Sequence, residues 1–187
     1  MKIKLCLIAL VLLVACMFLV CDKDEHYDIQ GRVIDAMTHQ PVEGAVVAIK
    51  WERYKWVIPL FLSERARDYG TSEWVTDAQG RFVLQKYPHG TFFMGVYKEG
   101  YVCWGSKKIY HPEGKTYEEK YVRRWWFTVK DGMTIELQPI TGNDFPVLEH
   151  ARFVSIVNDL VEGRKFADIT LGLRKVERED YLKRTKK

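Results

Sequence analysis

The sequence predicts an all-β fold: an antiparallel Greek-key β-sandwich of about seven strands, with a C-terminal helical extension and an N-terminal hydrophobic signal segment. Three observations predict it. Apolar and polar side chains alternate in short runs between residues 27 and 140, which is the period of a half-buried strand. Turns that contain Gly or Pro separate these runs. After Gly142 the apolar spacing changes to that of a helix.

Composition allows one packed domain and argues against nucleic acid as a partner. The chain has 187 residues, 47% of them hydrophobic, and a formal net charge of +4. Lys2 and Lys4 belong to the N-terminal segment, and without them the net charge is +2. Nucleic-acid binding needs a concentrated basic face. The basic run from Arg174 to Lys187 is interpreted as a solvated helix end rather than a membrane- or anion-binding tail.

The N-terminal segment, residues 1–21, reads as a targeting signal. Lysines precede an apolar run from Leu5 to Ala15, and Leu13-Val-Ala-Cys16 resembles the lipobox of bacterial lipoproteins. We therefore predict that Cys16 is lipidated. Two alternatives stay open, because apolar residues continue after Cys16. The run could be an uncleaved signal anchor, or the signal of a protein that is secreted without a tether.

The first two readings attach the protein to a membrane, within the cell envelope and facing the periplasm or the exterior. Residues 22–26 would then be a polar tether. An oxidising compartment permits a disulfide between Cys21 and Cys103. Two unpaired thiols, with Cys103 buried, is the alternative.

The sandwich is predicted over residues 27–140. A strand from Tyr27 to Ala36 is followed by a turn that contains Pro41 and Gly44. Ala45, Val47, Ile49 and Trp51 then share one face of a second strand. Residues 52–70 break the alternation, and we expect a long loop there.

Alternation resumes at Thr71 and predicts further strands. Asp77-Ala-Gln-Gly80 is expected to form a tight hairpin, with Gly80 in the left-handed conformation. The next strands are expected at Thr91–Lys98 and over Met133, Ile135 and Leu137. Between them, residues 105–130 form a second insertion with a polar middle. Its aromatic end, from Tyr121 to Val129, predicts an extra strand.

Residues 141–187 are expected to be helical. Val147, Ala151, Val154, Val157 and Val161 recur at helical spacing. Asn143 or Asp144 is expected to cap this helix, Pro146 suits its first turn, and Gly163 ends it. A further short helix is expected from Leu173 to Arg184.

The turn and strand motifs together resemble a known family. Gly31-Arg-Val-Ile-Asp, Pro41-Val-Glu-Gly-Ala-Val-Val, Thr76-Asp-Ala-Gln-Gly-Arg-Phe and Lys98-Glu-Gly-Tyr look like the carboxypeptidase regulatory-like domain. The resemblance covers Tyr27 to Pro139 and implies a transthyretin-like (prealbumin-like) β-sandwich. It also implies a non-catalytic accessory module, often on secreted or envelope proteins, with no particular ligand. His39-Gln40, which stands where the family often has Thr-Gly, the two insertions and the helical tail are departures.

No residue set in the sequence points to catalysis, a metal or a cofactor. The five histidines do not lie at metal-ligand spacing. Hydroxyisourate hydrolases share this general sandwich but end in Tyr-Arg-Gly-Ser, whereas this chain ends in Arg-Thr-Lys-Lys. Intradiol dioxygenases bind iron through two Tyr and two His with a His-x-His, which this chain lacks. We therefore expect no enzyme.

Aromatic residues gather in both insertions and suggest a binding role. Trp56, Trp125 and Trp126 are the candidates for stacking on sugar rings or lying at a membrane interface. The competing interpretation is that the aromatics cap the ends of the sandwich and pack against the helix. The sequence thus predicts a protein-interaction or structural module of the envelope, or alternatively a module that binds carbohydrate or peptidoglycan.

Overall fold

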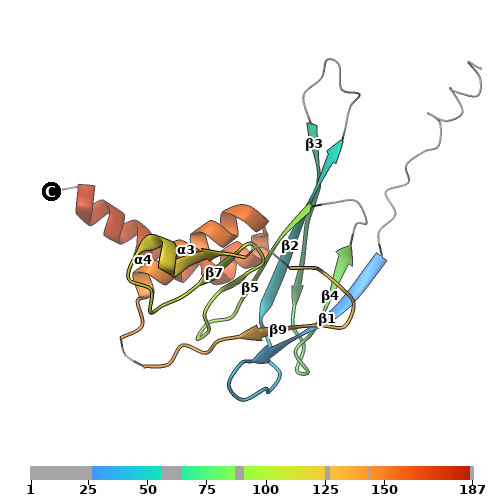
Figure 1. Cartoon of the computed structure of the whole chain (residues 1–187), viewed down its shortest axis with the longest axis horizontal. Coiled ribbons are helices and arrows are strands. Elements are labelled where there is room, and N and C mark those ends of the chain that lie inside the picture. The colour runs from blue at the N-terminus through green and yellow to red at the C-terminus, as the bar shows by residue number, and fades with distance from the viewer. Residues whose placement is uncertain (1–26, 56–64, 87–90, 125–126, 143, 186–187) are drawn as a thin grey trace, which may run out of the picture.

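The computed structural model describes residues 27–55, 65–86, 91–124, 127–142 and 144–185. The predicted all-β sandwich with a C-terminal helical part is confirmed (Figure 1). Seven of the described strands form its two sheets. One sheet has the order β4-β1-β9 and the other β3-β2-β5-β6. The bounds are β1 Tyr27–Asp35, β2 Val46–Lys55, β3 Arg65–Val75, β4 Arg81–Lys86, β5 Thr91–Tyr97, β6 Trp104–Gly105 and β9 Met133–Leu137.

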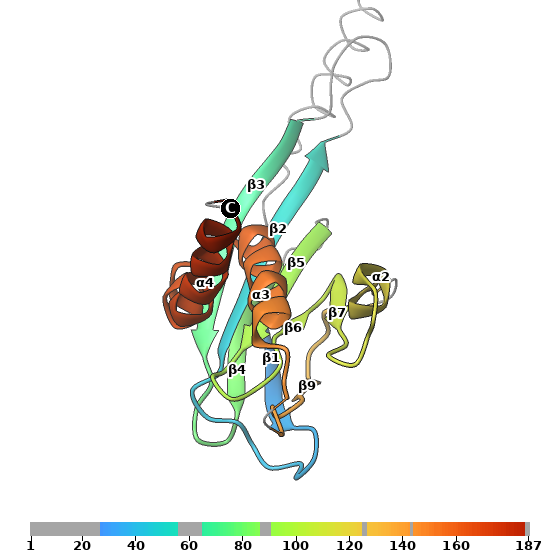
Figure 2. The same ribbon diagram turned by 90° about the vertical axis from the view of Figure 1, so that its left-hand side faces the viewer.

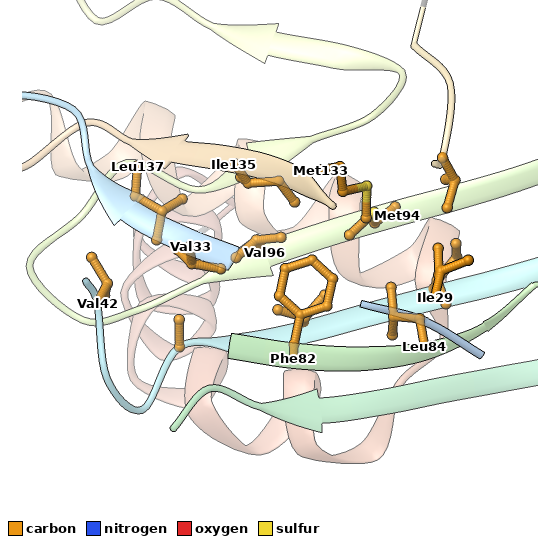
Figure 3. Packing of buried hydrophobic residues seen from close by; sticks show 14 of the residues in the cluster. Ile29, Val33, Val42, Phe82, Leu84, Met94, Val96, Met133, Ile135 and Leu137 are labelled. Atoms are coloured by element: carbon orange, nitrogen blue, oxygen red, sulfur yellow. The ribbon is translucent and has the colours of Figure 1, made fainter. Parts of the chain in front are cut away.

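The core lies between the two sheets. Strand β1 buries alternate residues, Ile29, Gly31 and Val33, as its sequence predicts. Gly31 is required because the Phe82 ring of β4 occupies the space that a Cβ atom would fill. Figure 3 shows how side chains of β1, β4, β5 and β9 and of the β1–β2 turn meet there: Ile29, Val33, Val42, Phe82, Leu84, Met94, Val96, Met133, Ile135 and Leu137.

The two C-terminal helices form a third layer. Helix α3 (Val147–Val161) and helix α4 (Arg164–Thr185) pack on the outer face of the sheet that contains β2 and β5 (Figure 2). The first part of β2 is therefore buried on both faces: Val47 and Ile49 face the sandwich core, whereas Val46 and Ala48 face the helices. The helical extension is thus packed against the sandwich through a second apolar core.

Three helix predictions need correction. The second helix begins at Arg164, nine residues before the expected start at Leu173, because Phe166 on its first turn is fully buried against the sheet. Helix α3 has Pro146 at its N-cap, with no side-chain cap among the described residues, so Asp144 does not cap it. Asn143 lies outside the described residues. Helix α3 ends just before Gly163 but not through it, because Glu162 rather than the glycine takes the left-handed conformation at its C-cap.

The expected loop over residues 52–70 is wrong in extent. Strand β2 continues to Lys55 and β3 begins at Arg65, so both ends of that stretch are paired strand. A β-bulge lies between Trp51 and Glu52, where the alternation of apolar residues stops. Beyond the bulge the residues of the two strands no longer alternate between apolar and polar, so their sequence carries no strand pattern although their backbones pair.

Two details of the sandwich differ from expectation. The turn at Asp77–Gly80 is tight, with Gly80 at φ +70°, but it joins strands of different sheets and is not a hairpin. Strand β9 pairs with β1 in parallel, whereas the other ladders are antiparallel in the described residues. Alternation alone does not distinguish a parallel from an antiparallel neighbour.

The second insertion folds as a small unit beside the sandwich. Strands β7 (Lys108–Tyr110) and β8 (Tyr121–Arg123) pair with each other, and the one-turn helix α2 (Tyr117–Lys120) lies between them in sequence. Thr116 and Glu119 form a capping box that starts α2. The extra strand that was expected to reach Val129 ends at Arg123.

Candidate functional site

Most residues singled out from the sequence lie outside the described residues. Cys16, Cys21, Trp56, Trp125 and Trp126 belong to this group, so the lipidation and stacking assignments stay predictions. Cys103 is described: it is a buried free thiol whose burial raises its pKa. A bridge between Cys103 and Cys21 also stays a prediction.

Three of the described aromatics at the insertions, Trp51, Trp104 and Tyr110, are packed inward, whereas Tyr117 is exposed. Trp51 is buried in the sandwich core, and Trp104 packs against that core. Tyr110 of β7 is buried against α3, where its ring stacks on Phe153 at 5.5 Å between centroids. These residues behave as the packing interpretation predicts, so they offer no open aromatic platform.

A β-ribbon, which we call the arm, extends from one end of the sandwich (Figures 1 and 2). The neighbouring strand β5 pairs with β2 only as far as Glu52, opposite Thr91. Beyond that point, in the part of the chain that the structure describes, β2 pairs only with β3, from Arg53 opposite Arg67 to Lys55 opposite Arg65. The arm is therefore the paired segments Arg53–Lys55 and Arg65–Arg67; the chain that joins them lies outside the described residues.

The first groove lies between the edge strands β3 and β4 and has a volume of about 410 Å³. Trp74 is 43% exposed on β3, and the half-buried Tyr69 lies on the same strand. Asp28 and Gln85 add polar groups to the lining. Sequence reasoning placed Trp74 on a strand face but missed its exposure, because nothing in the local pattern marks β3 as an edge strand.

The second groove lies at the opposite edge of the sandwich, between β6 and β9, and has a volume of about 400 Å³. The Cζ atom of Arg124 lies 4.6 Å from the ring centroid of Trp104 and 5.8 Å from that of Phe127. The two rings meet edge to face at 4.8 Å. Sequence reasoning missed Arg124, because it read the whole aromatic stretch as one strand.

A third groove, of about 450 Å³, lies between α2 and α3. Tyr117 is exposed at its rim, and Lys120 and Glu149 form an ion pair across it at 3.6 Å. Its charged groups thus neutralise one another in part.

His150 of α3 is buried among aromatic rings. Its Nε2 accepts a hydrogen bond of 2.9 Å from the backbone N–H of Cys103, while its Nδ1 has no partner within the described residues. Burial lowers the pKa of His150 to about 4, so the ring is neutral at pH 7. The imidazole therefore joins α3 to the β5–β6 connection as a neutral acceptor.

Histidines and carboxylates do not converge in the described residues. His39 lies in the β1–β2 turn, His111 in the turn after β7 and His150 in the buried helix face. Within the described ranges no three His, Cys, Asp or Glu side chains are grouped as metal ligands. In the same ranges, no helix combines the length and the apolar character that crossing a membrane requires.

No family model and no curated protein matches this chain. Solved structures give distant likenesses. 3-Chlorocatechol 1,2-dioxygenase from Rhodococcus opacus aligns at 14% identity and a TM-score of 0.39, over 64% of this chain and 62% of that one. The C-terminal domain of a shaft pilin from Lactobacillus rhamnosus aligns at 14% identity and a TM-score of 0.32, over 62% of this chain and 99% of the domain.

Catechol 1,2-dioxygenase from Pseudomonas arvilla aligns at 14% identity and a TM-score of 0.36, over 67% of this chain and 56% of that one. This chain thus spans less than two thirds of the length of both dioxygenases. All three TM-scores lie below 0.5. The carboxypeptidase regulatory-like domain stays a resemblance of motifs.

Proposed function

We propose that this protein is a non-catalytic module of the cell envelope, tethered to a membrane by its N-terminal segment, that binds a protein partner through the arm. The observation that carries the proposal is that the arm leaves the sandwich. A two-stranded ribbon is marginally stable in water by itself. An arm that pairs with no third strand in the described residues is best explained as a contact element.

The sequence of the arm supports this role. The chain that joins Lys55 to Arg65 contains the apolar run Trp56-Val-Ile-Pro-Leu-Phe-Leu62. Basic residues flank this run on both sides, at Arg53 and Lys55 and at Arg65 and Arg67. An apolar run in the chain that joins two paired strands supplies binding energy when a partner covers it.

An arm-shortened variant tests the role of the arm. Arg53 and Arg67 are register partners, so an Asn-Gly turn that replaces residues 54–66 keeps the ladder in register. We expect this variant to keep the circular dichroism of the wild type and to lose its cross-linked partner in cells. Unchanged cross-linked products from a folded, arm-shortened protein would contradict the proposal.

The membrane tether is tested separately, by labelling with radioactive palmitate. We expect the wild type to be labelled and Cys16→Ala to lose the label. Equal labelling would show that Cys16 is not the lipidated residue. An unlabelled wild type that stays in the membrane fraction would favour the signal anchor.

A second candidate function is carbohydrate binding, and the first groove favours it. Trp74 and Tyr69 supply aromatic faces, while Asp28 and Gln85 supply hydrogen-bonding groups. Such a combination suits sugar rings. Peptidoglycan fragments would then quench tryptophan fluorescence in the wild type and not in Trp74→Ala. Quenching that persists in Trp74→Ala, or that is absent from the wild type, would remove the first groove as a glycan site.

A further inference from the structure

Arg124 lines the second groove, and within the described residues no carboxylate pairs with it. Its guanidinium lies over Trp104 and beside Phe127. Its Nε is buried and has no hydrogen-bond partner within the described residues. Desolvation lowers the pKa of this arginine. A partly buried cation that lacks a counter-ion is unfavourable unless a ligand supplies one.

Two other charged side chains line this groove, Lys108 and Glu136. No ion pair within 4 Å joins Arg124 to Glu136 in the described part of the chain, and Glu136 is exposed on β9. The groove therefore carries one net positive charge. The aromatic rings restrict the guanidinium, so its two terminal Nη groups are held for the two oxygens of one carboxylate.

The other wall of the groove is the outer edge of β9, along which no second strand pairs in the described residues. The carbonyl oxygen of Leu137 accepts from Ala36 on the β1 side, and Gln138 accepts from Val102 on the opposite side. Because backbone groups alternate sides along a strand, those of Thr134 and Glu136 point toward the groove. A strand edge of this kind binds an extended polypeptide through main-chain hydrogen bonds.

We propose that the second groove binds the C-terminal end of an extended polypeptide, which adds to β9 as a strand and places its terminal carboxylate on Arg124. The strand edge selects a polypeptide over a glycan, because it offers a ladder of main-chain donors and acceptors. The arginine fork selects a free carboxylate over an amide. This site lies apart from the arm and does not depend on it.

The test uses a library of pentapeptides with free C-terminal carboxylates and the same library with C-terminal amides, each immobilised through its N-terminus. We expect the wild-type protein to bind members of the free-carboxylate library at least tenfold more strongly than their amides. Arg124→Gln should lose that preference, and Arg124→Lys should keep only part of it. Bound peptide should shift the backbone amide resonances of Thr134 and Glu136.

Stability measurements on Arg124→Met separate a binding role from a structural one. Methionine keeps an apolar stem against Trp104 and removes the unpaired charge. We expect its melting temperature without peptide to equal or exceed that of the wild type. A clear drop in that temperature would indicate that Arg124 serves the fold instead.

Three outcomes would overturn the proposal. The first is no enrichment from the carboxylate library, or equal enrichment from the amides. The second is binding that is unchanged in Arg124→Gln. The third is Arg124-dependent binding of an oligosaccharide of uronic acids, with no binding of any peptide. The arm-shortened variant should keep the preference for free carboxylates. The test of the peptide site is therefore independent of the test of the arm as a contact element.

Discussion

The carboxylate of Glu73 on β3 accepts a hydrogen bond of 2.9 Å from the backbone N–H of Phe166, in the first turn of α4. Its other oxygen accepts from the N–H of Lys165 at 3.1 Å. A negative side chain at this place satisfies two free amide groups and complements the helix dipole. The sandwich thus supplies the cap that starts its own covering helix.

Removing this cap should destabilise the whole protein. We expect Glu73→Ala to lower the free energy of unfolding by about 1–2 kcal/mol, in the range of helix-cap losses. For a chain of this size that corresponds to a fall in melting temperature of about 2–8 °C. Calorimetry checks it, with the exposed Glu113→Ala as the control. A Glu73→Ala protein as stable as this control would show that the cap contributes nothing.

The contact between the sheet and the helices also explains one glycine. A Cβ atom at Gly95 of β5 would lie about 3.1 Å from the Phe166 ring and would press on Val157. We expect Gly95→Ala to lower the free energy of unfolding by about 1–3 kcal/mol, because overpacking forces the helices away from the sheet.

Gly172 of α4 provides the matched control for this change. Apart from the nearby backbone of its own helix and its two chain neighbours, no described heavy atom lies within 4 Å of a Cβ placed there. The same substitution, Gly172→Ala, should raise the free energy of unfolding by about 0.5–1 kcal/mol through helix propensity. Chemical denaturation measures the free energy of unfolding of both variants. If the two substitutions changed it in the same direction, the packing account would be contradicted.

His150 makes stability depend on pH. Its pKa is about 4 in the folded protein, against a reference value of 6.5. Below pH 6.5 the unfolded chain therefore binds a proton that the folded chain does not, and stability falls until about pH 4. The loss approaches about 3 kcal/mol over that range.

His150→Gln should remove this dependence, because glutamine accepts the Cys103 N–H bond without titrating. We expect the stability advantage of the wild type over the variant to shrink as the pH falls from 7 to 4.5. Urea denaturation at several pH values measures it. Parallel pH profiles for the two proteins would show that His150 does not titrate as described.

The turn between β1 and β2 carries backbone strain at His39, whose φ is +58°. Residues other than glycine occupy this region at a penalty of about 1–2 kcal/mol. We expect His39→Gly to relieve this strain and raise the free energy of unfolding by up to about 1 kcal/mol. The gain is smaller than the penalty because the greater entropy of glycine in the unfolded chain opposes folding. His39→Ala keeps the strain and should not be more stable than the wild type. If the alanine variant gains as much as the glycine variant, strain is not the cause.

The sequence predicts the sandwich strands well where one face is buried. Met133, Ile135 and Leu137 alternate with exposed residues, and the structure buries all three. It predicts the arm poorly, because the paired residues beyond Glu52 show no alternation of apolar and polar side chains in the sequence. The parallel pairing of β9 with β1 cannot be read from the sequence either, because a parallel and an antiparallel β9 would bury the same residues.

The second groove was not predictable from the sequence for a different reason. Arg124 reaches Trp104 only because the insertion folds back beside β6, with the Arg124 N–H donating to the Lys107 carbonyl at 2.8 Å. Contacts between segments this far apart in sequence have no local pattern. Trp74 was missed similarly, because its exposure depends on which strand lies at the edge of the sheet.

The central claim, that the arm is the contact element of an envelope module, is tested most directly by photo-cross-linking in cells. A photoreactive amino acid is placed at position 55 or 65 in the arm, and at the exposed position 79 in the β3–β4 turn as the control. The account predicts a discrete protein adduct from both arm positions and none from position 79. No adduct from the arm, or equal adducts from position 79, would contradict it.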